Sequence, residues 1–225
     1  MRGPSSQAEL VDRIEAEDLA RARWYSFFSR WFLAPPDERA IALFVPSPKV
    51  QTDPATAVEP GPGSPLESAW QTFIAALPGQ SLADIKSSYD DTFLSVGEAP
   101  VSLHASVYLT GFSNERPLAE VRQWLAAQGI QSSQAGLLTE DHLGLLCEAM
   151  AWLIIGKDGE SSAGGAADTA GEHSQQFLFQ RFISPVCDEF CQRLAGAPEA
   201  GVYRSLGALF AAFCAVERQA FDIDR

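Results

Sequence analysis

Apolar residues recur at intervals of three and four positions along nearly every segment of this 225-residue chain. That spacing places side chains on one face of an α-helix, whereas the strands of a half-buried sheet alternate every second residue. No convincing two-residue alternation occurs in the sequence. The spacing therefore predicts an all-α fold, a helical bundle in which residues 1–225 form a single domain.

Breaks between the apolar repeats divide the chain into its predicted elements. The predicted helices cover residues of about 8–33, 37–44, 65–77, 82–93, 117–128, 139–156, 177–194 and 198–216, with an irregular segment at 97–116. We expect Ser64 and Ser81 to cap the helices that follow them, and Pro185 to kink its helix. Residues 130–138 are polar and small, which favours a hinge between an N-terminal and a C-terminal half. Residues 157–172 contain no large apolar side chain, so we expect a mobile loop there.

The most apolar predicted helix opens with a charged cluster. Its buried stripe consists of Leu143, Leu146, Cys147, Met150, Leu153 and Ile154. Thr139 is the predicted N-cap, and Glu140 and Asp141 follow in the first turn, where carboxylates face the positive end of the helix dipole. The carboxylate of Asp141 would favour the charged form of His142. The pattern predicts that this cluster lies at the exposed end of a buried helix.

Composition limits the classes of partner and compartment. The net charge is −13, with 29 acidic and 16 basic residues, which argues against a nucleic-acid surface. The excess of acid would attract a basic peptide, or would only keep the protein in solution. No run approaches 18 apolar residues and residues 1–12 lack a signal-peptide core, so we expect a cytoplasmic protein without membrane insertion. The four cysteines are then expected to be reduced.

Two sequence blocks carry a resemblance to a known family. One block is Asp141-His142-Leu143 at the start of the apolar helix, and the other comprises Tyr89, Phe93, Gly97, Pro100 and Ser106-Val107-Tyr108-Leu109. In order and approximate spacing they resemble the motifs of the TorD/DmsD/NarJ family of chaperones for molybdenum-cofactor redox enzymes. The chain departs from that pattern at Leu138-Thr139, where the family has Glu-Pro, at Glu98 after Gly97, and at Leu103-His104-Ala105.

The resemblance implies a TorD-like helical domain that is not an enzyme and needs no cofactor. It would bind the catalytic subunit of a molybdoenzyme, through a basic leader peptide or the apo form, assist cofactor insertion and delay export. The protein would be a monomer or a domain-swapped dimer. The residues expected at the peptide are Asp141 as the preferred acid, Glu140, His142, Ser106 and Tyr89, with Tyr108, Trp70 and Trp124 as aromatic walls. Core packing is the other interpretation of each aromatic residue.

The alternative to a binding protein is an enzyme. A small metal-dependent hydrolase would use His104, His142 and His173, and Cys187-x-x-x-Cys191 with a histidine would form a zinc site. The three histidines show no clustered spacing, and a lone Cys-x-x-x-Cys pair is a weak metal signal. The sequence contains no phosphate-binding loop, dinucleotide motif or nucleophile elbow.

Overall fold

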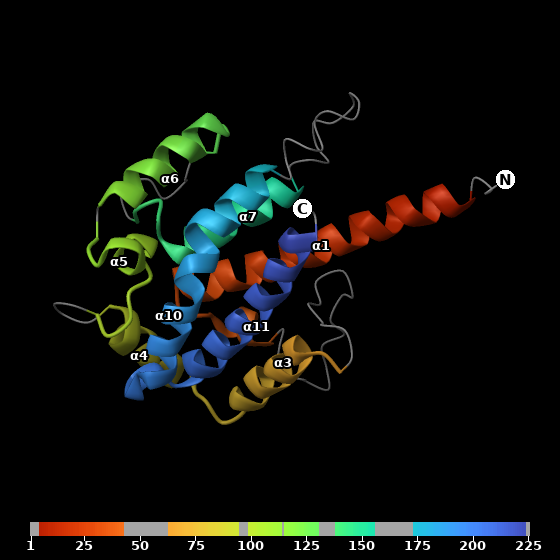
Figure 1. The fold of residues 1–225 in the computed structure, drawn as a ribbon. Helices are drawn as coiled ribbons and strands as arrows, with labels where there is room; N and C mark the ends of the chain where they lie inside the picture. Colours follow the sequence, from red (N-terminus) through yellow and green to blue (C-terminus); the bar gives the residue numbers. More distant parts are fainter. Residues whose placement is uncertain are drawn as a thin grey trace.

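The computed structural model of this chain describes residues 5–42, 63–94, 99–113, 115–130, 138–155 and 173–223. The predicted mobile loop at 157–172 lies outside the described residues, as do residues 131–137 of the predicted hinge. Every named element within the described ranges is a helix or helical turn, and no strand occurs among them (Figure 1). The all-α class predicted from the apolar spacing is therefore confirmed.

The helices occur in the predicted order along the chain. They are α1 (Ser5–Leu33), α2 (Glu38–Ala42), α3 (Pro65–Ala76), α4 (Leu82–Phe93), α5 (Ala105–Thr110), α6 (Arg116–Ala127), α7 (Leu143–Ile155), the π-helical turn η2 (Phe179–Ile183), α10 (Ser184–Gly196), the 3₁₀ turn η3 (Pro198–Ala200) and α11 (Val202–Ile223). The prediction of an irregular segment at 97–116 was wrong in part, because α5 lies within this range. Six residues are too few to produce a repeating apolar pattern. None of the described helices is both long and apolar enough to cross a membrane.

Capping side chains fix the starts of α3 and α4 as the sequence predicted. Ser64 Oγ accepts a hydrogen bond from the backbone N–H of Glu67 at 3.0 Å, and proline occupies the start of the helix. Ser81 and Asp84 form a reciprocal capping box, in which the backbone N–H of Asp84 donates to Ser81 Oγ and that of Ser81 donates to Asp84 Oδ2. Each cap satisfies backbone donors that have no partner within the helix.

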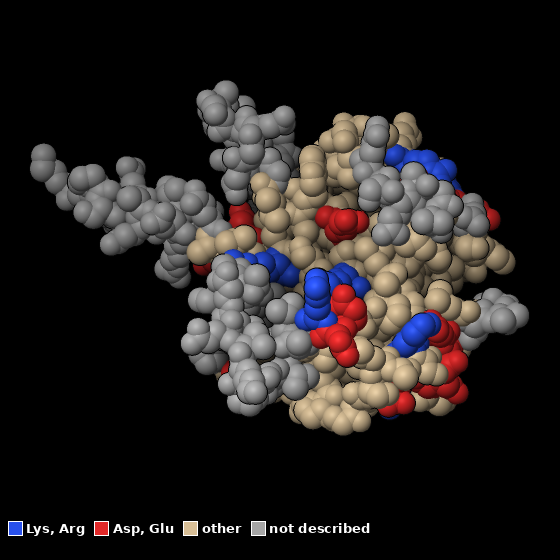
Figure 2. Space-filling view, turned by 180° about the vertical axis from the view of Figure 1, so that it is seen from behind, with Lys and Arg blue, Asp and Glu red and all other residues tan. Residues whose placement is uncertain are grey.

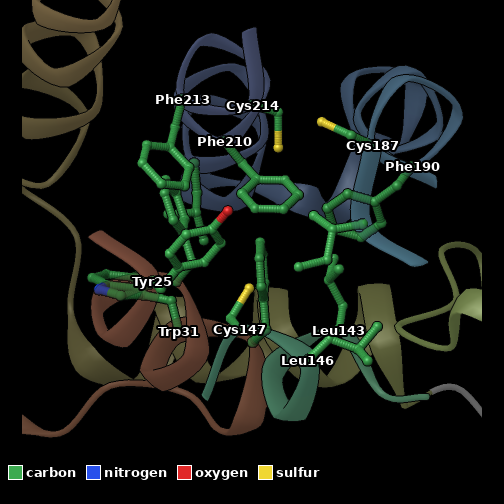
Figure 3. Close-up of a cluster of buried hydrophobic side chains, with 14 of the residues drawn as sticks. Tyr25, Trp31, Leu143, Leu146, Cys147, Cys187, Phe190, Phe210, Phe213 and Cys214 are labelled. Atoms are coloured by element: carbon green, nitrogen blue, oxygen red, sulfur yellow. The ribbon is translucent and has the colours of Figure 1, made fainter. Parts of the chain in front are cut away.

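The core forms where α1 packs along α7, and α11 packs against α10 and α3 (Figure 1). Aromatic side chains of α1 and α11 interlock, as Tyr25, Phe210 and Phe213 do in Figure 3. Ring centroids are 4.9 Å apart for both Phe28–Phe210 and Tyr25–Phe213. Gly144 lets α7 approach α1, because a Cβ atom there would lie 2.8 Å from Leu33 Cγ. The side chains of α1 that join this core are Ala22, Trp24, Tyr25, Phe27, Phe28, Trp31 and Phe32, whereas Leu19 of α1 and Val216 of α11 are each 45% exposed.

The helix that contains Pro185 changes its hydrogen-bonding pattern just before the proline. Residues 173–178 are helical, residues 179–183 form the π turn, and α10 continues to residue 196. The backbone N–H of Ser184 donates to the carbonyl of Phe179, five residues earlier. Proline has no N–H and would crowd the carbonyl four residues before it in a regular helix. The predicted disturbance at Pro185 therefore takes the form of a wider turn upstream of it.

A buried ion pair joins α1 to α11 within this apolar core. The Glu217 carboxylate is 1% exposed and accepts from Arg21 Nε at 2.8 Å, from Arg21 Nη2 at 2.9 Å and from the Tyr25 hydroxyl at 2.8 Å. Arg21 also donates to Gln175 at 3.2 Å. Burial opposes the charge of Arg21, but its hydrogen bond to Glu217 and the attraction of that carboxylate raise its pKa above the ordinary value. The network connects α1 to two C-terminal segments.

Removing one partner of this pair should destabilise the fold. We expect Glu217→Gln to lower the free energy of unfolding by at most about 3–5 kcal/mol, because Arg21 then keeps only the half-buried Asp18, 3.0 Å away, as a counter-ion. Glu189→Gln is the matched control, since Glu189 pairs with Arg193 at the surface, and a loss below about 1 kcal/mol is expected. Urea unfolding followed by circular dichroism measures both variants. Equal losses would contradict the structural importance of the buried pair.

Candidate functional site

The two sequence blocks meet through a short extended crossing. The backbone N–H of Ala105 donates to the carbonyl of Asp141 at 2.9 Å, and that of Leu143 donates to the carbonyl of Leu103 at 2.7 Å. These bonds form an antiparallel bridge between His104 and His142. The start of α5 and the start of α7 are thereby joined. The order of the blocks in the sequence did not predict this contact.

Asp141 forms the buried centre of the crossing. Its Oδ2 accepts hydrogen bonds from the Ser106 hydroxyl and from the Ser106 backbone N–H, the latter at 3.1 Å, and its Oδ1 accepts from the Thr139 hydroxyl at 2.6 Å. The side chain at the N-cap position of α5 makes no capping bond, so Asp141 supplies that bond from 35 residues away. The prediction that Asp141 lies at the exposed end of a helix was wrong, since the residue is 1% exposed.

His142, not Thr139, occupies the capping position of α7. Its carbonyl accepts from the backbone N–H of Leu146 at 2.9 Å, and its Nδ1 accepts from that of Gly144 at 3.2 Å. The ring lies edge-on to His104 at 5.3 Å between centroids. Burial lowers the pKa of His142 to about 4, His104 adds to this effect, and Asp141 opposes it. His142 is therefore neutral at neutral pH, which corrects the expectation that Asp141 would keep it charged.

Glu140 is the acid of this cluster that meets solvent. Its two carboxylate oxygens accept from Arg122 Nε and Nη2 at 2.8 and 2.7 Å, a bidentate pair between α6 and the turn before α7. The side chains of Glu140 and Arg122 are 27% and 57% exposed. The Arg122 hydrogen bonds lower the pKa of Glu140, so the carboxylate stays charged. The sequence ranked Glu140 behind Asp141, but the structure gives it the exposed position.

The aromatic residues predicted as groove walls do not gather at this cluster. Trp70 lies in the core, 5.4 Å from Trp24 and 5.7 Å from Phe27 between ring centroids. Tyr89 is 3% exposed and donates its hydroxyl proton to the carbonyl of Phe32 at 2.8 Å. Core packing, the other interpretation of Trp70, describes its place in the structure. Peptide contact at Trp70 or Tyr89 stays a prediction, and the burial of both side chains argues against it.

Two other aromatic residues lie nearer the surface. Tyr108 of α5 is half-buried, its hydroxyl donates to the carbonyl of Ser102 at 2.6 Å, and the Arg193 guanidinium lies 5.1 Å from its ring. Trp124 of α6 is also half-buried and stacks on Phe177, with ring centroids 5.4 Å apart. Sequence reasoning did not pair Trp124 with Phe177, because nothing local in the sequence links the two residues.

Charged side chains on the surface are paired across the helices. Figure 2 shows basic and acidic side chains side by side on one face of the molecule. Arg181 Nε and Nη2 donate to the two carboxylate oxygens of Glu120 at 2.8 and 2.7 Å, and Arg218 donates to Asp188 at 3.0 Å. A cationic group of a binding partner must therefore compete with an arginine of this chain for such a carboxylate.

The cluster does not have the geometry of a hydrolase. Ser106 donates to Asp141 and not to a histidine, and Nδ1 of His142 accepts from the backbone. A nucleophile beside its base is thus missing at this crossing. Across the described parts of the chain, no group of three or more histidine, cysteine, aspartate or glutamate side chains could hold a metal ion. The arrangement of His104, His142 and His173 therefore gives the enzymatic alternative no support.

Loss of the Asp141 carboxylate should unfold the crossing. Asp141→Ala leaves two buried donors on Ser106 and one half-buried donor on Thr139 without this acceptor, and an unsatisfied buried donor costs about 1–3 kcal/mol. We expect a loss of unfolding free energy of at least this size. Asp91→Ala, at an exposed position of α4, should change stability by less than about 0.5 kcal/mol. Thermal unfolding of both variants provides the comparison.

The lowered pKa of His142 predicts a pH-dependent stability. The folded value is about 4 and the ordinary value is 6.5, so the unfolded chain takes up the proton first as the pH falls. This contribution is complete above about pH 6.5 and is lost towards pH 4, with a size on the order of 3 kcal/mol.

His142→Asn should remove this dependence, because asparagine can cap the helix without titrating. His173→Asn, at an exposed histidine, should leave it unchanged. Urea unfolding between pH 7 and pH 4.5 measures the difference between each variant and the wild type. A His142→Asn profile parallel to that of the wild type would contradict the assignment.

Comparison with known proteins identifies the family of this chain. The family described as "Nitrate reductase delta subunit" matches residues 59–192, which is more than half of the chain. Two curated relatives, each named "Chaperone protein TorD", come from Vibrio vulnificus strains YJ016 and CMCP6. Each is 28% identical over 136 residues, which cover 60% of this chain and 62% of the relative. The chain thus spans less than two thirds of the length of these relatives. It belongs to the nitrate reductase delta subunit family, and the predicted family is confirmed.

Proposed function

We propose that this member of the nitrate reductase delta subunit family is a cytoplasmic maturation chaperone for a molybdenum-cofactor oxidoreductase. It would bind the basic leader peptide or the apo form of the catalytic subunit, assist cofactor insertion and delay export. The family match and the relatives named as chaperones support the class of function. The proposed activity is binding without catalysis, so it requires no metal, nucleotide or cofactor.

The bidentate pair of Glu140 with Arg122 is the observation that carries the proposal. It lies where the two family blocks meet, and it already has the fork-to-fork geometry by which carboxylates recognise guanidinium groups. Arg122 therefore occupies the place that a leader arginine would take. Asp141 cannot serve as this acid in the observed conformation, because it is buried and both its oxygens accept internal bonds. We therefore assign the arginine contact to Glu140, with Asp141 positioning the turn that carries it.

An apolar contact is available on the segment next to α6. Phe112 lies between α5 and α6 and is 69% exposed, and Gly111 just before it ends α5 with a φ of +86°. A large apolar side chain left uncovered at this position suits the apolar part of a leader peptide. The proposal thus combines a charged contact at Glu140 with an apolar contact at Phe112. Tyr108, at the end of the same family block, would bound the site on α5.

Peptide titration tests the charged contact. The probe is a synthetic peptide with two adjacent arginines followed by an apolar segment, and binding is measured by calorimetry. Glu140→Gln should weaken binding by about 1–3 kcal/mol, the range for a hydrogen bond to a charged group. Arg122→Ala should strengthen binding, because it removes the internal competitor. A peptide with lysine at both positions should bind less tightly, since lysine cannot form the bidentate pair.

Asp188→Asn is the matched control, because Asp188 is an exposed carboxylate that pairs with Arg218 of α11 and not with a residue of the proposed site. Its affinity for the peptide should equal that of the wild type. If folded Glu140→Gln protein binds the arginine peptide as tightly as the wild type does, the proposed acid is wrong. If Arg122→Ala weakens binding, Arg122 contacts the peptide itself and the idea of an internal competitor fails.

A further inference from the structure

Three of the four cysteines are buried in the core, and the fourth lies beside them near the surface. Cys147, Cys187 and Cys214 are 0% exposed, on α7, α10 and α11, and Cys191 is half-buried on α10. All four are free thiols. Figure 3 shows the sulfur atoms of Cys187 and Cys214 turned toward each other between α10 and α11. The proposed peptide site uses none of these residues.

Cys187 and Cys191 form a pair on α10. Their Sγ atoms lie 3.9 Å apart, four residues apart on the same helix. A disulfide bond is about 2 Å long, so the two sulfurs are nearly in contact and need to approach further by about that distance. Because Cys191 is half-buried, a small oxidant can approach it, and the buried Cys187 is the second thiol within contact distance. This arrangement is an accessible thiol with a resolving thiol next to it, which is typical of redox-sensitive pairs.

The surroundings of the pair suit Cys187 to the role of the attacking sulfur. Hydrogen bonds with Cys191 and Cys214, together with the Arg218 cation, lower the pKa of Cys187. The hydrogen bond with Cys187 and burial raise the pKa of Cys191, and burial raises the pKa of Cys147 and of Cys214, so exposure alone distinguishes Cys191 from these two as the thiol that a peroxide can reach. Arg218 lies close because it binds Ser184 and Asp188 in the first turn of α10.

We propose that Cys187 and Cys191 are a site of reversible disulfide formation. Hydrogen peroxide, or a peroxide of similar size, would transfer one oxygen atom to the Cys191 thiol, giving a sulfenic acid and one water molecule. The sulfur of Cys187 would then attack the sulfur of Cys191, so that the S–O bond breaks, the S–S bond forms and the second water molecule leaves. The two thiols lose two electrons and two protons, and the peroxide is reduced to two water molecules.

The helix makes this bond easy to reverse. Residues four apart on an α-helix have Cβ atoms about 5–6 Å apart, whereas a relaxed disulfide requires about 3.5–4.5 Å. Closing the bond must therefore distort the first turns of α10, and a strained disulfide is reduced more readily than a relaxed one. Thiol reductants should return the protein to the dithiol form. Oxidation is thus expected to be a reversible modification and not a permanent cross-link.

Mass spectrometry of the oxidised protein tests the inference. The full chain is treated with hydrogen peroxide, its remaining thiols are alkylated under denaturing conditions, and a protease digest identifies linked peptides. We expect two of the four thiols to escape alkylation, a cross-link between Cys187 and Cys191, and full recovery of alkylation after dithiothreitol. Cys191→Ser should prevent the cross-link, and Cys147→Ser, as the control at another buried thiol, should leave it intact.

Two results would overturn the inference. One is a peroxide-treated protein in which all four thiols still alkylate. The other is a cross-link that joins Cys187 to Cys214, which would show that α10 and α11 provide the reactive pair. Because Cys191 is half-buried, the serine variant is expected to fold, and circular dichroism checks this. The outcome does not depend on peptide binding, so the proposed function can fail while this site stands.

Discussion

The buried carboxylate of Asp141 is the interaction on which the candidate site depends. It accepts bonds from Ser106 and Thr139, so it joins the start of α5 to the turn before α7. A carboxylate that is 1% exposed is stable only when its oxygens have partners, and here each oxygen has at least one. Glu140 directly precedes Asp141 in the sequence, so the bonds that hold Asp141 also set the position of Glu140. Asp141 therefore acts on the surface through the backbone that it holds in place.

The bundle contains a second buried carboxylate, and the two have different roles. Glu217 connects α1 to α11 through Arg21 and Tyr25, deep among aromatic side chains. A buried ion pair seldom adds much net stability over an apolar pair of equal volume, because both charges lose their hydration. It does penalise any packing in which the partners separate. We infer that Glu217 fixes how α1 lies against α11, whereas Asp141 fixes how the family blocks meet.

Local signals predicted the fold well and the site only in part. The spacing of apolar residues predicted the principal helices, and Ser64 and Ser81 predicted two of their starts, because these signals act within a few residues. The resemblance singled out Asp141, His142 and Ser106, but not the crossing that brings them together. The burial of Asp141 was missed because its main donor, Ser106, is 35 residues away and nothing near Asp141 indicates it. Glu217 was missed for the same reason, since its partners are more than 190 residues away.

The π turn before Pro185 adds one residue to the helix that contains it. A π turn has a residue more than an α-helix needs to cover the same path, and each residue of an α-helix turns the chain by about 100°. Without this wider turn, the extra residue would rotate residues 173–178 relative to α10 by about that angle. Gln175 would then turn away from Arg21, and Phe177 would turn away from Trp124. The π turn thus preserves the rotational phase between the two halves of one continuous helix.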